Sequence, residues 1–148
     1  MKRLILCTLL VAGCAESGSA TKSEGTTAQI QKPLYDRLGG KDAITAVVDD
    51  FVGNVAKDAR INARFAKTDI PHLKQMLVEQ ICEASGGPCK YSGKDMKTAH
   101  QGQNVTEAEF NALVEDLGTS LDKFKVGKTE QSQLVGALAP MKPEIVGQ

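Results

Sequence analysis

Apolar residues recur at helical spacing along this chain, and no stretch alternates between apolar and polar residues for long enough to suggest a strand. After Asp42 the apolar positions follow one another at intervals of three and one residues in alternation, as Ile44, Val47, Val48, Phe51, Val52 and Val55. Polar residues such as Asp49 and Lys57 stand opposite them. This spacing is typical of an amphipathic helix with one buried face. The pattern therefore predicts an all-α domain.

Residues that start and stop helices divide this pattern into segments. Asp69 can cap a helix with Pro71 in its first turn, and Gly86–Pro88 ends that helix. Thr106–Glu109 matches a capping box and opens a long helix. The apolar register of that helix comprises Phe110, Leu113, Val114, Leu117, Leu121 and Phe124. Two further helices are predicted, one from near Pro33 to Leu38–Gly40 and one from near Thr129 to Pro140 and Pro143.

Residues 1–13 have the features of a signal peptide. A basic start precedes an apolar run, Leu4–Ala12, that is too short to span a bilayer. The segment LVAGC, Leu10–Cys14, resembles a bacterial lipobox. This resemblance implies cleavage before Cys14 and acylation of that cysteine. An ordinary secretory signal cut near Ala20 is the alternative.

Residues 14–32 are polar and small, which predicts a flexible tether ahead of a domain at 33–148. With an acylated Cys14 the protein is expected in the bacterial cell envelope, anchored by lipid and facing the periplasm. Ala15 after the cysteine resembles the sorting pattern of the outer membrane. The 18 basic residues balance 18 acidic ones, with no basic stripe interleaved with aromatic residues. Nucleic acid is therefore not an expected partner.

Two cysteines, Cys82 and Cys89, remain once Cys7 is assigned to the leader and Cys14 to acylation. In an oxidising envelope they are expected to form a disulfide around Gly86–Pro88. Two free thiols or a metal pair are the alternatives, although the C-x6-C spacing without a nearby histidine disfavours zinc. The chain has no C-x-x-C-H motif, so covalent haem attachment is not indicated.

One of the two histidines, His100, ends a helical turn within YSGKDMKTAHQG, Tyr91–Gly102. Met96, Ala99 and His100 share one face at helical spacing, so the imidazole is expected to point inward. An inward histidine is either satisfied by a backbone carbonyl group or serves as a metal ligand. Neutral imidazole is a common ligand of haem iron.

Six features resemble group I truncated haemoglobins in their order and spacing. They are LYDRLGG (34–40), VVDDF (47–51), Phe65, GGP (86–88), YSGKDMKTAHQG (91–102) and LAPMKPEIV (138–146). The resemblance covers about residues 33–146. It implies a two-over-two helical sandwich that holds one non-covalent haem b, with His100 as the proximal ligand of its iron.

The same resemblance implies a role for further residues of the haem pocket. Phe65 corresponds to the family's phenylalanine that packs against the porphyrin. The positions that line the proximal side or approach the haem propionates are Tyr91, Met96, Lys97 and Val105. Lys97 is the candidate for an ion pair with a propionate, and a solvated lysine is the alternative.

The distal side departs from the family pattern. Val52 stands where the family usually has a tyrosine, and Leu73 and Leu77 stand where it has glutamines. Without these donors, bound O2 would lose a charge-assisted hydrogen bond of roughly 1.5–3 kcal/mol. Faster O2 dissociation is therefore expected, whereas NO and CO would be affected less.

Met76 is a candidate sixth iron ligand, because it lies one helical turn after Leu73, where some family members carry a histidine ligand. A core methionine over the haem is the simpler interpretation. His72 precedes Leu73 by one residue, about 100° round the helix, and is expected at the solvent edge.

The function expected from these features is reversible binding of O2, NO or CO, an activity of the oxygen-transport type. A six-coordinate electron-transfer protein is one alternative, and a nitric oxide dioxygenase, which needs a long-lived oxygen complex, is a disfavoured second one. Whether the protein is an enzyme stays open, as does the identity of a reductase or redox partner. A haem-free helical lipoprotein is disfavoured because His100 and Phe65 are both present.

Overall fold

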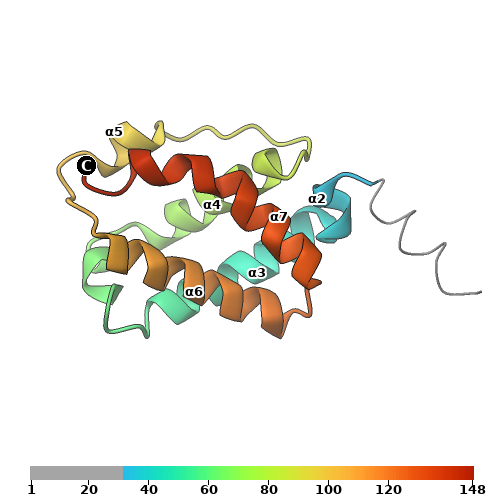
Figure 1. The fold of residues 1–148 in the computed structure, drawn as a ribbon, viewed down its shortest axis with the longest axis horizontal. Coiled ribbons are helices and arrows are strands. Elements are labelled where there is room, and N and C mark those ends of the chain that lie inside the picture. Colours follow the sequence, from blue (N-terminus) through green and yellow to red (C-terminus); the bar gives the residue numbers. More distant parts are fainter. Residues whose placement is uncertain (1–31) are drawn as a thin grey trace, which may run out of the picture.

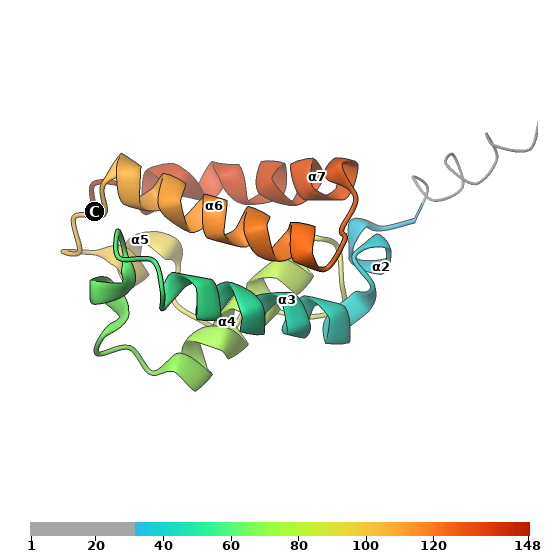
Figure 2. The same ribbon diagram turned by 90° about the horizontal axis from the view of Figure 1, so that it is seen from below.

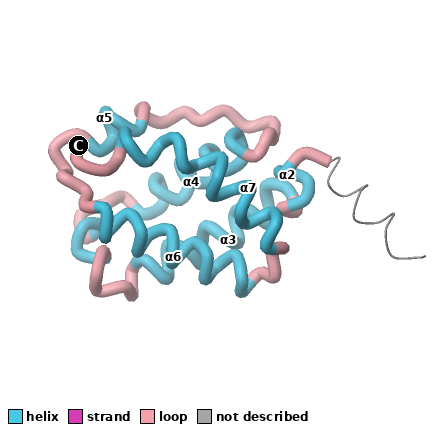
Figure 3. The backbone as a smooth tube through the Cα atoms, in the orientation of Figure 1, coloured by secondary structure: helices cyan, strands magenta, loops and turns pink. Residues whose placement is uncertain are grey.

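The computed structural model describes residues 32–148, and its regular structure there is helical apart from one isolated bridge, which confirms the all-α prediction (Figure 3). The elements are α2 (Leu34–Arg37), α3 (Gly40–Val55), η1 (Asn62–Phe65), α4 (Ile70–Ala84), α5 (Met96–His100), α6 (Glu107–Lys123), α7 (Lys128–Leu138) and η2 (Ala139–Glu144), where η is a 3-10 helix. The signal peptide and Cys14 lie outside the described residues. Within those residues no helix is both long and apolar enough to cross a membrane.

The long helices form two layers. Helices α6 and α7 lie over α3 and α4, which confirms the predicted two-over-two arrangement (Figure 2). Helix α3 packs against both α4 and α6 and joins the two layers. Helix α5 packs against η2, and the C-terminus lies beside this pair at one end of the molecule (Figure 1).

The predicted caps are present where the sequence placed them. The Asp69 carboxylate accepts a hydrogen bond from the backbone N–H of His72 over 3.1 Å. Thr106 and Glu109 form the capping box, in which each side chain accepts the other residue's backbone N–H. Helix α3 begins at Gly40, and the residue before it, Gly39, has the left-handed φ of 94°. A Cβ atom added at Gly39 would lie 2.8 Å from Ala43 Cβ. A side chain at this turn would therefore disturb the start of α3.

The core contains the expected face of α3, together with the C-terminal half of α4 and the middle of α6. Its buried apolar residues include Ile44, Val47, Val48, Phe51, Ile81, Cys82, Leu117, Leu121 and Leu134. One sequence expectation was wrong: Phe124, placed in the apolar register of α6, is 42% exposed. Helix α6 ends at Lys123, so Phe124 follows the last helical residue and no longer keeps that register.

The short turn η1 was not predicted, because four residues carry no measurable periodicity. Arg64 of η1 donates hydrogen bonds to both carboxylate oxygens of Glu109 over 2.5 and 2.7 Å and to the Gln103 carbonyl over 2.7 Å. The Arg64 guanidinium, with the Thr106 cap, lowers the pKa of Glu109 to about 2. This bidentate ion pair ties η1 to the start of α6 and sets the position of Phe65.

Cys82 and Cys89 form a disulfide, so of the three alternatives the structure contains the bridge. Cys82 is fully buried in the last turns of α4, and Cys89 lies in the segment that leads to α5. The bond therefore fastens that segment to the end of α4.

We expect reduction of this bridge to lower the free energy of unfolding by about 2–3 kcal/mol, because the chain-entropy model assigns that value to a loop of this length. Urea unfolding with and without a thiol reductant measures the difference. Cys89→Ala should have the stability of the reduced protein and should not respond to the reductant. An unchanged midpoint on reduction would contradict the expectation.

Candidate functional site

His100 ends α5 and is half-buried. Its Nδ1 lies 2.8 Å from the carbonyl oxygen of Met96, one turn earlier. A carbonyl oxygen can only accept, so Nδ1 carries the proton, and in neutral imidazole Nε2 then keeps its lone pair. The two interpretations of His100 are therefore compatible, because a histidine satisfied by a carbonyl through Nδ1 can still bind a metal through Nε2.

Helix α5 has only five residues, too few for a helix that is stable by itself in water. Asp95 caps it by accepting a hydrogen bond from the backbone N–H of Thr98 over 2.9 Å. The Thr98 side chain and, after it, the Thr98 N–H lower the pKa of Asp95. The Tyr91 hydroxyl donates to the Lys94 carbonyl over 2.9 Å, and burial raises the pKa of Tyr91. The direction of the His100 side chain thus depends on contacts outside the helix.

Helix α4 supplies some of those contacts. One Glu79 carboxylate oxygen accepts hydrogen bonds from the backbone N–H and the hydroxyl of Ser92, over 3.0 and 2.6 Å. One Glu83 oxygen accepts the backbone N–H of Tyr91 over 2.9 Å. The Ser92 hydroxyl lowers the pKa of Glu79, and the Tyr91 N–H lowers the pKa of Glu83. With the disulfide, these bonds hold the approach to α5 against α4.

The elements around α5 leave many apolar side chains only half-buried. They are Phe65 of η1, Leu73, Met76 and Leu77 of α4, Met96 of α5, Phe110 and Leu113 of α6, and Met141 of η2. In the other half of α4, by contrast, Ile81 is 4% exposed and Cys82 is fully buried. Incompletely covered apolar side chains on these elements, together with an imidazole that has a free lone pair, are compatible with a flat, apolar group that carries a metal.

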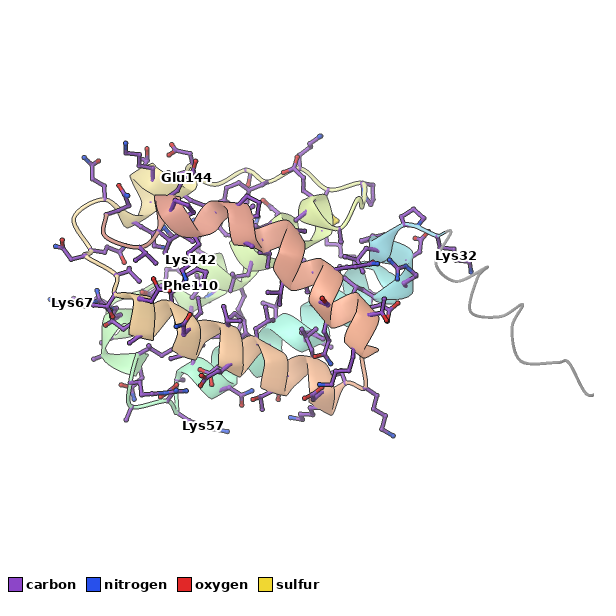
Figure 4. All side chains as sticks on the ribbon, in the orientation of Figure 1. Lys32, Lys57, Lys67, Phe110, Lys142 and Glu144 are labelled. Carbon is purple, nitrogen blue, oxygen red and sulfur yellow. A yellow bond between two sulfur atoms is a disulfide. The ribbon has the colours of Figure 1, made fainter. Side chains whose placement is uncertain are left out.

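A cation stands over part of this apolar surface. Lys142 Nζ lies 5.4 Å from the centroid of the Phe110 ring and pairs with the Glu107 carboxylate (Figure 4). The contact joins η2 to the first turns of α6.

The expected distal residues come from two helices that pack against each other, α3 and α4. Val52 of α3 is 6% exposed, and Leu73 and Leu77 of α4 are half-buried. None of these three side chains has a hydrogen-bond donor. Met76 is half-buried on α4, whereas His72 is exposed, as expected for a histidine at the solvent edge.

The remaining predicted residues differ in burial. Val105 is half-buried, forms the isolated bridge with Val146 and accepts the Gly147 N–H over 2.9 Å. Phe65 and Met96 are half-buried as well, while Lys97 is exposed.

Gln80 is a residue of this region that the sequence analysis missed. Its side-chain amide donates to the sulfur atoms of Met96 and Met141, each over 3.2 Å. The signal was available in the sequence, because position 80 is seven residues after Leu73 and lies on the same face of the helix. Glu79 and Glu83 were missed because their partners lie in a loop, which has no periodicity.

Comparison with known proteins gives the family context. The family model for bacterial-like globins matches residues 33–146. The group 1 truncated hemoglobin GlbN of Mycolicibacterium paratuberculosis is 37% identical over 112 residues, which cover 76% of this chain and 82% of that protein. The group 1 truncated hemoglobin of Tetrahymena thermophila is 31% identical over 109 residues, which cover 74% of this chain and 87% of that protein.

Solved structures agree with these matches. The Fe(III) form of the Tetrahymena pyriformis truncated hemoglobin has a TM-score of 0.77 and 28% identity, and covers 79% of this chain and 100% of that one. The 2/2 hemoglobin of a Synechococcus species, in the cyanomet state with covalently attached heme, has a TM-score of 0.73 and 28% identity, and covers 78% of this chain and 98% of that one.

The contact between Glu79 and Ser92 should depend on pH. Because the pKa of Glu79 is lower when folded than its ordinary 4.5, the contact stabilises the fold fully above that value. It is lost only below 4.5, as the pH falls through the lowered pKa. We expect the Ser92 amide resonance in NMR spectra to titrate in that acid range. Glu79→Gln should abolish this titration but leave that of Tyr91, which reports Glu83; a Ser92 resonance that still titrates in the variant would contradict the assignment.

Proposed function

The chain belongs to the bacterial-like globins and, within them, to the group 1 truncated haemoglobins, and we propose that it binds haem through His100 and takes up a diatomic gas. Haem with its iron is the cofactor of this family. When bound, the haem supplies the iron to which O2, NO or CO attaches. The observation that carries the proposal is the His100 imidazole, whose Nδ1 is engaged and whose Nε2 keeps its lone pair.

On the proximal side, the hydrogen bond from Nδ1 to the Met96 carbonyl has two effects. It stops the imidazole ring from rotating, and it raises the basicity of Nε2 toward a metal. The half-buried side chains of Phe65, Tyr91 and Val105 then provide apolar surface for the porphyrin. Lys97, which is exposed, is available to a propionate at the solvent edge.

On the distal side, Val52, Leu73 and Leu77 exclude water but donate no hydrogen bond to a bound gas. Because a bound O2 would carry partial negative charge, its binding would be strengthened most by a hydrogen-bond donor and weakened most where these side chains supply none. NO and CO depend less on such a donor. We therefore assign reversible gas binding with fast O2 release. Nitric oxide dioxygenation, which needs long-lived bound O2, is not favoured.

The proposal includes export and anchoring in the cell envelope. Its support is the LVAGC segment at Leu10–Cys14 and the polar residues 14–32 that follow. The disulfide of the described domain is also the kind of bond that persists in an oxidising compartment. In this proposal an acylated Cys14 holds the globin domain at the periplasmic face of the outer membrane.

We expect His100→Gly to weaken haem binding by at least about a hundredfold, because loss of an outer-shell partner alone weakens metal sites by about ten- to a hundredfold. Haem titration followed by the Soret band measures the change. Added imidazole should restore a ligated spectrum in the variant. His72→Gly is the matched control and should bind haem like the unmodified chain.

The ferrous spectrum of the unmodified chain tests the alternative of electron transfer. A five-coordinate spectrum that converts fully with CO supports the gas site. A six-coordinate low-spin spectrum that resists CO would instead favour Met76 as a second ligand, and Met76→Leu would then return the iron to five-coordination. An unchanged haem affinity of His100→Gly without imidazole would contradict the proximal assignment.

Leu77→Gln should slow O2 dissociation by about tenfold to a hundredfold, because it restores a charge-assisted hydrogen bond of roughly 1.5–3 kcal/mol to bound O2. Stopped-flow displacement of O2 by CO gives the rate. Leu77→Met has a similar volume without a donor and should release O2 at the original rate. Equal effects of the two substitutions would show that pocket shape, not hydrogen bonding, controls O2 release.

Lipid attachment at Cys14 can be tested in a bacterial host that expresses the full chain. We expect labelled palmitate to be incorporated and the protein to sediment with the outer membrane. Cys14→Ser should abolish both results, whereas Cys7→Ser, in the same leader, should abolish neither. A soluble periplasmic protein with an intact Cys14 would contradict the anchor and favour cleavage near Ala20.

A further inference from the structure

We propose that Gln80 is a positioning residue for the proximal histidine, acting through the Met96 side chain. The inference rests on the proposed function of His100 as the haem ligand. It is carried by two contacts of one methionine: the Met96 sulfur accepts from the Gln80 amide over 3.2 Å, and the Met96 carbonyl accepts from His100 Nδ1 over 2.8 Å. Met96 therefore links α4 to the imidazole.

The surroundings of Gln80 make a polar side chain at this position energetically unfavourable. Gln80 is half-buried beside Leu77, Met96 and Met141, which offer no strong acceptor. A thioether sulfur is a weak acceptor, so these bonds compensate poorly for removing an amide from water. An apolar residue would fill this position more stably. The amide instead orients its neighbours, because it fixes the positions of two sulfur atoms that belong to different elements.

The short length of α5 explains why the position of the Met96 side chain matters for the orientation of His100. Met96 is the first residue of this five-residue helix, and His100 is the last. The bond from Nδ1 to the Met96 carbonyl spans the helix, so a shift of Met96 changes the bond that orients the ring. Asp95 caps the same turn through the Thr98 N–H but does not hold the Met96 side chain. Gln80 supplies that hold from α4.

Met141 provides the internal comparison. Its sulfur accepts from the same Gln80 nitrogen at the same distance, 3.2 Å, but it belongs to η2. Loss of the Met141 sulfur removes a partner of Gln80 without breaking the connection from Gln80 to Met96. The proposal therefore assigns a role in orienting His100 to the contact with Met96 and none to the chemically identical contact with Met141.

The test uses Gln80→Met, which keeps an unbranched side chain of similar size but has no donor, and Met96→Leu, which removes the sulfur acceptor. Met141→Leu is the matched control. In the haem-free chain, 15N chemical shifts of the His100 ring report which nitrogen is protonated. We expect the Nδ1-protonated form in the unmodified chain and in Met141→Leu, and a mixture of both tautomers in Gln80→Met and Met96→Leu.

In the haem-loaded chain, the iron–histidine stretching band in the resonance Raman spectrum of the ferrous form gives a second reading. A weaker bond at Nδ1 makes Nε2 a poorer donor, so the band should move to lower frequency in Gln80→Met and Met96→Leu. Haem loss should become about tenfold faster, at the lower end for outer-shell partners. The double variant Gln80→Met/Met96→Leu should resemble either single variant, because both break the same connection.

Two negative results have different meanings. If the unmodified chain fails to bind haem, the proposed function is wrong, while the 15N shifts still test the role of Gln80. If haem binds but Gln80→Met leaves the ring shifts and the Raman band unchanged, the positioning role is overturned. An equal effect of Met141→Leu would also overturn it, because Gln80 would then act through general packing.

Discussion

The hydrogen bond from His100 Nδ1 to the Met96 carbonyl is the interaction on which the site depends. It determines which ring nitrogen carries the proton, and so which one can bind iron. Both groups belong to a five-residue helix that is not stable without outside support. The bond is therefore only as well oriented as the contacts that place this helix, and most of those contacts start on α4.

Helix α4 has different functions on its different faces. Its apolar face carries Leu73 and Leu77, the proposed distal residues, and its polar residues Glu79 and Glu83 bind the backbone that leads to α5. A displacement of α4 would thus change both sides of the site together. Hydrogen bonding is concentrated on the proximal side, where it controls orientation, and is missing from the distal side chains, where it would select the ligand. In the proposed function, this arrangement fixes the histidine and leaves a bound gas without a hydrogen-bond donor.

The long elements could be predicted from the sequence because their signals are local. Helix α3 repeats its apolar residues at regular intervals, and Thr106 begins α6 with a capping box. Helical spacing singled out His100 as an inward histidine, and the resemblance to truncated haemoglobins added its role as a haem ligand and the distal positions. Helical spacing shows that Gln80 shares a face with Leu73, but the contacts of Gln80 and of Glu79 were not predictable, because their partners lie 16 and 13 residues away in sequence and meet them only after the chain has folded. Phe124 was wrongly expected to be buried for a related reason, since helical spacing alone does not indicate the residue at which a helix ends.

The bridge between Cys82 and Cys89 also affects how the site recovers from disturbance. The carboxylate contacts of Glu79 and Glu83 can open one at a time, as local fluctuations or acid release them. The covalent bond stays closed throughout and keeps the segment before α5 attached to the end of α4. An opened site therefore has a small conformational space to search before it closes again, since short tethered segments lose little entropy on return. When α5 is briefly disordered, the disulfide therefore still keeps it near its native position.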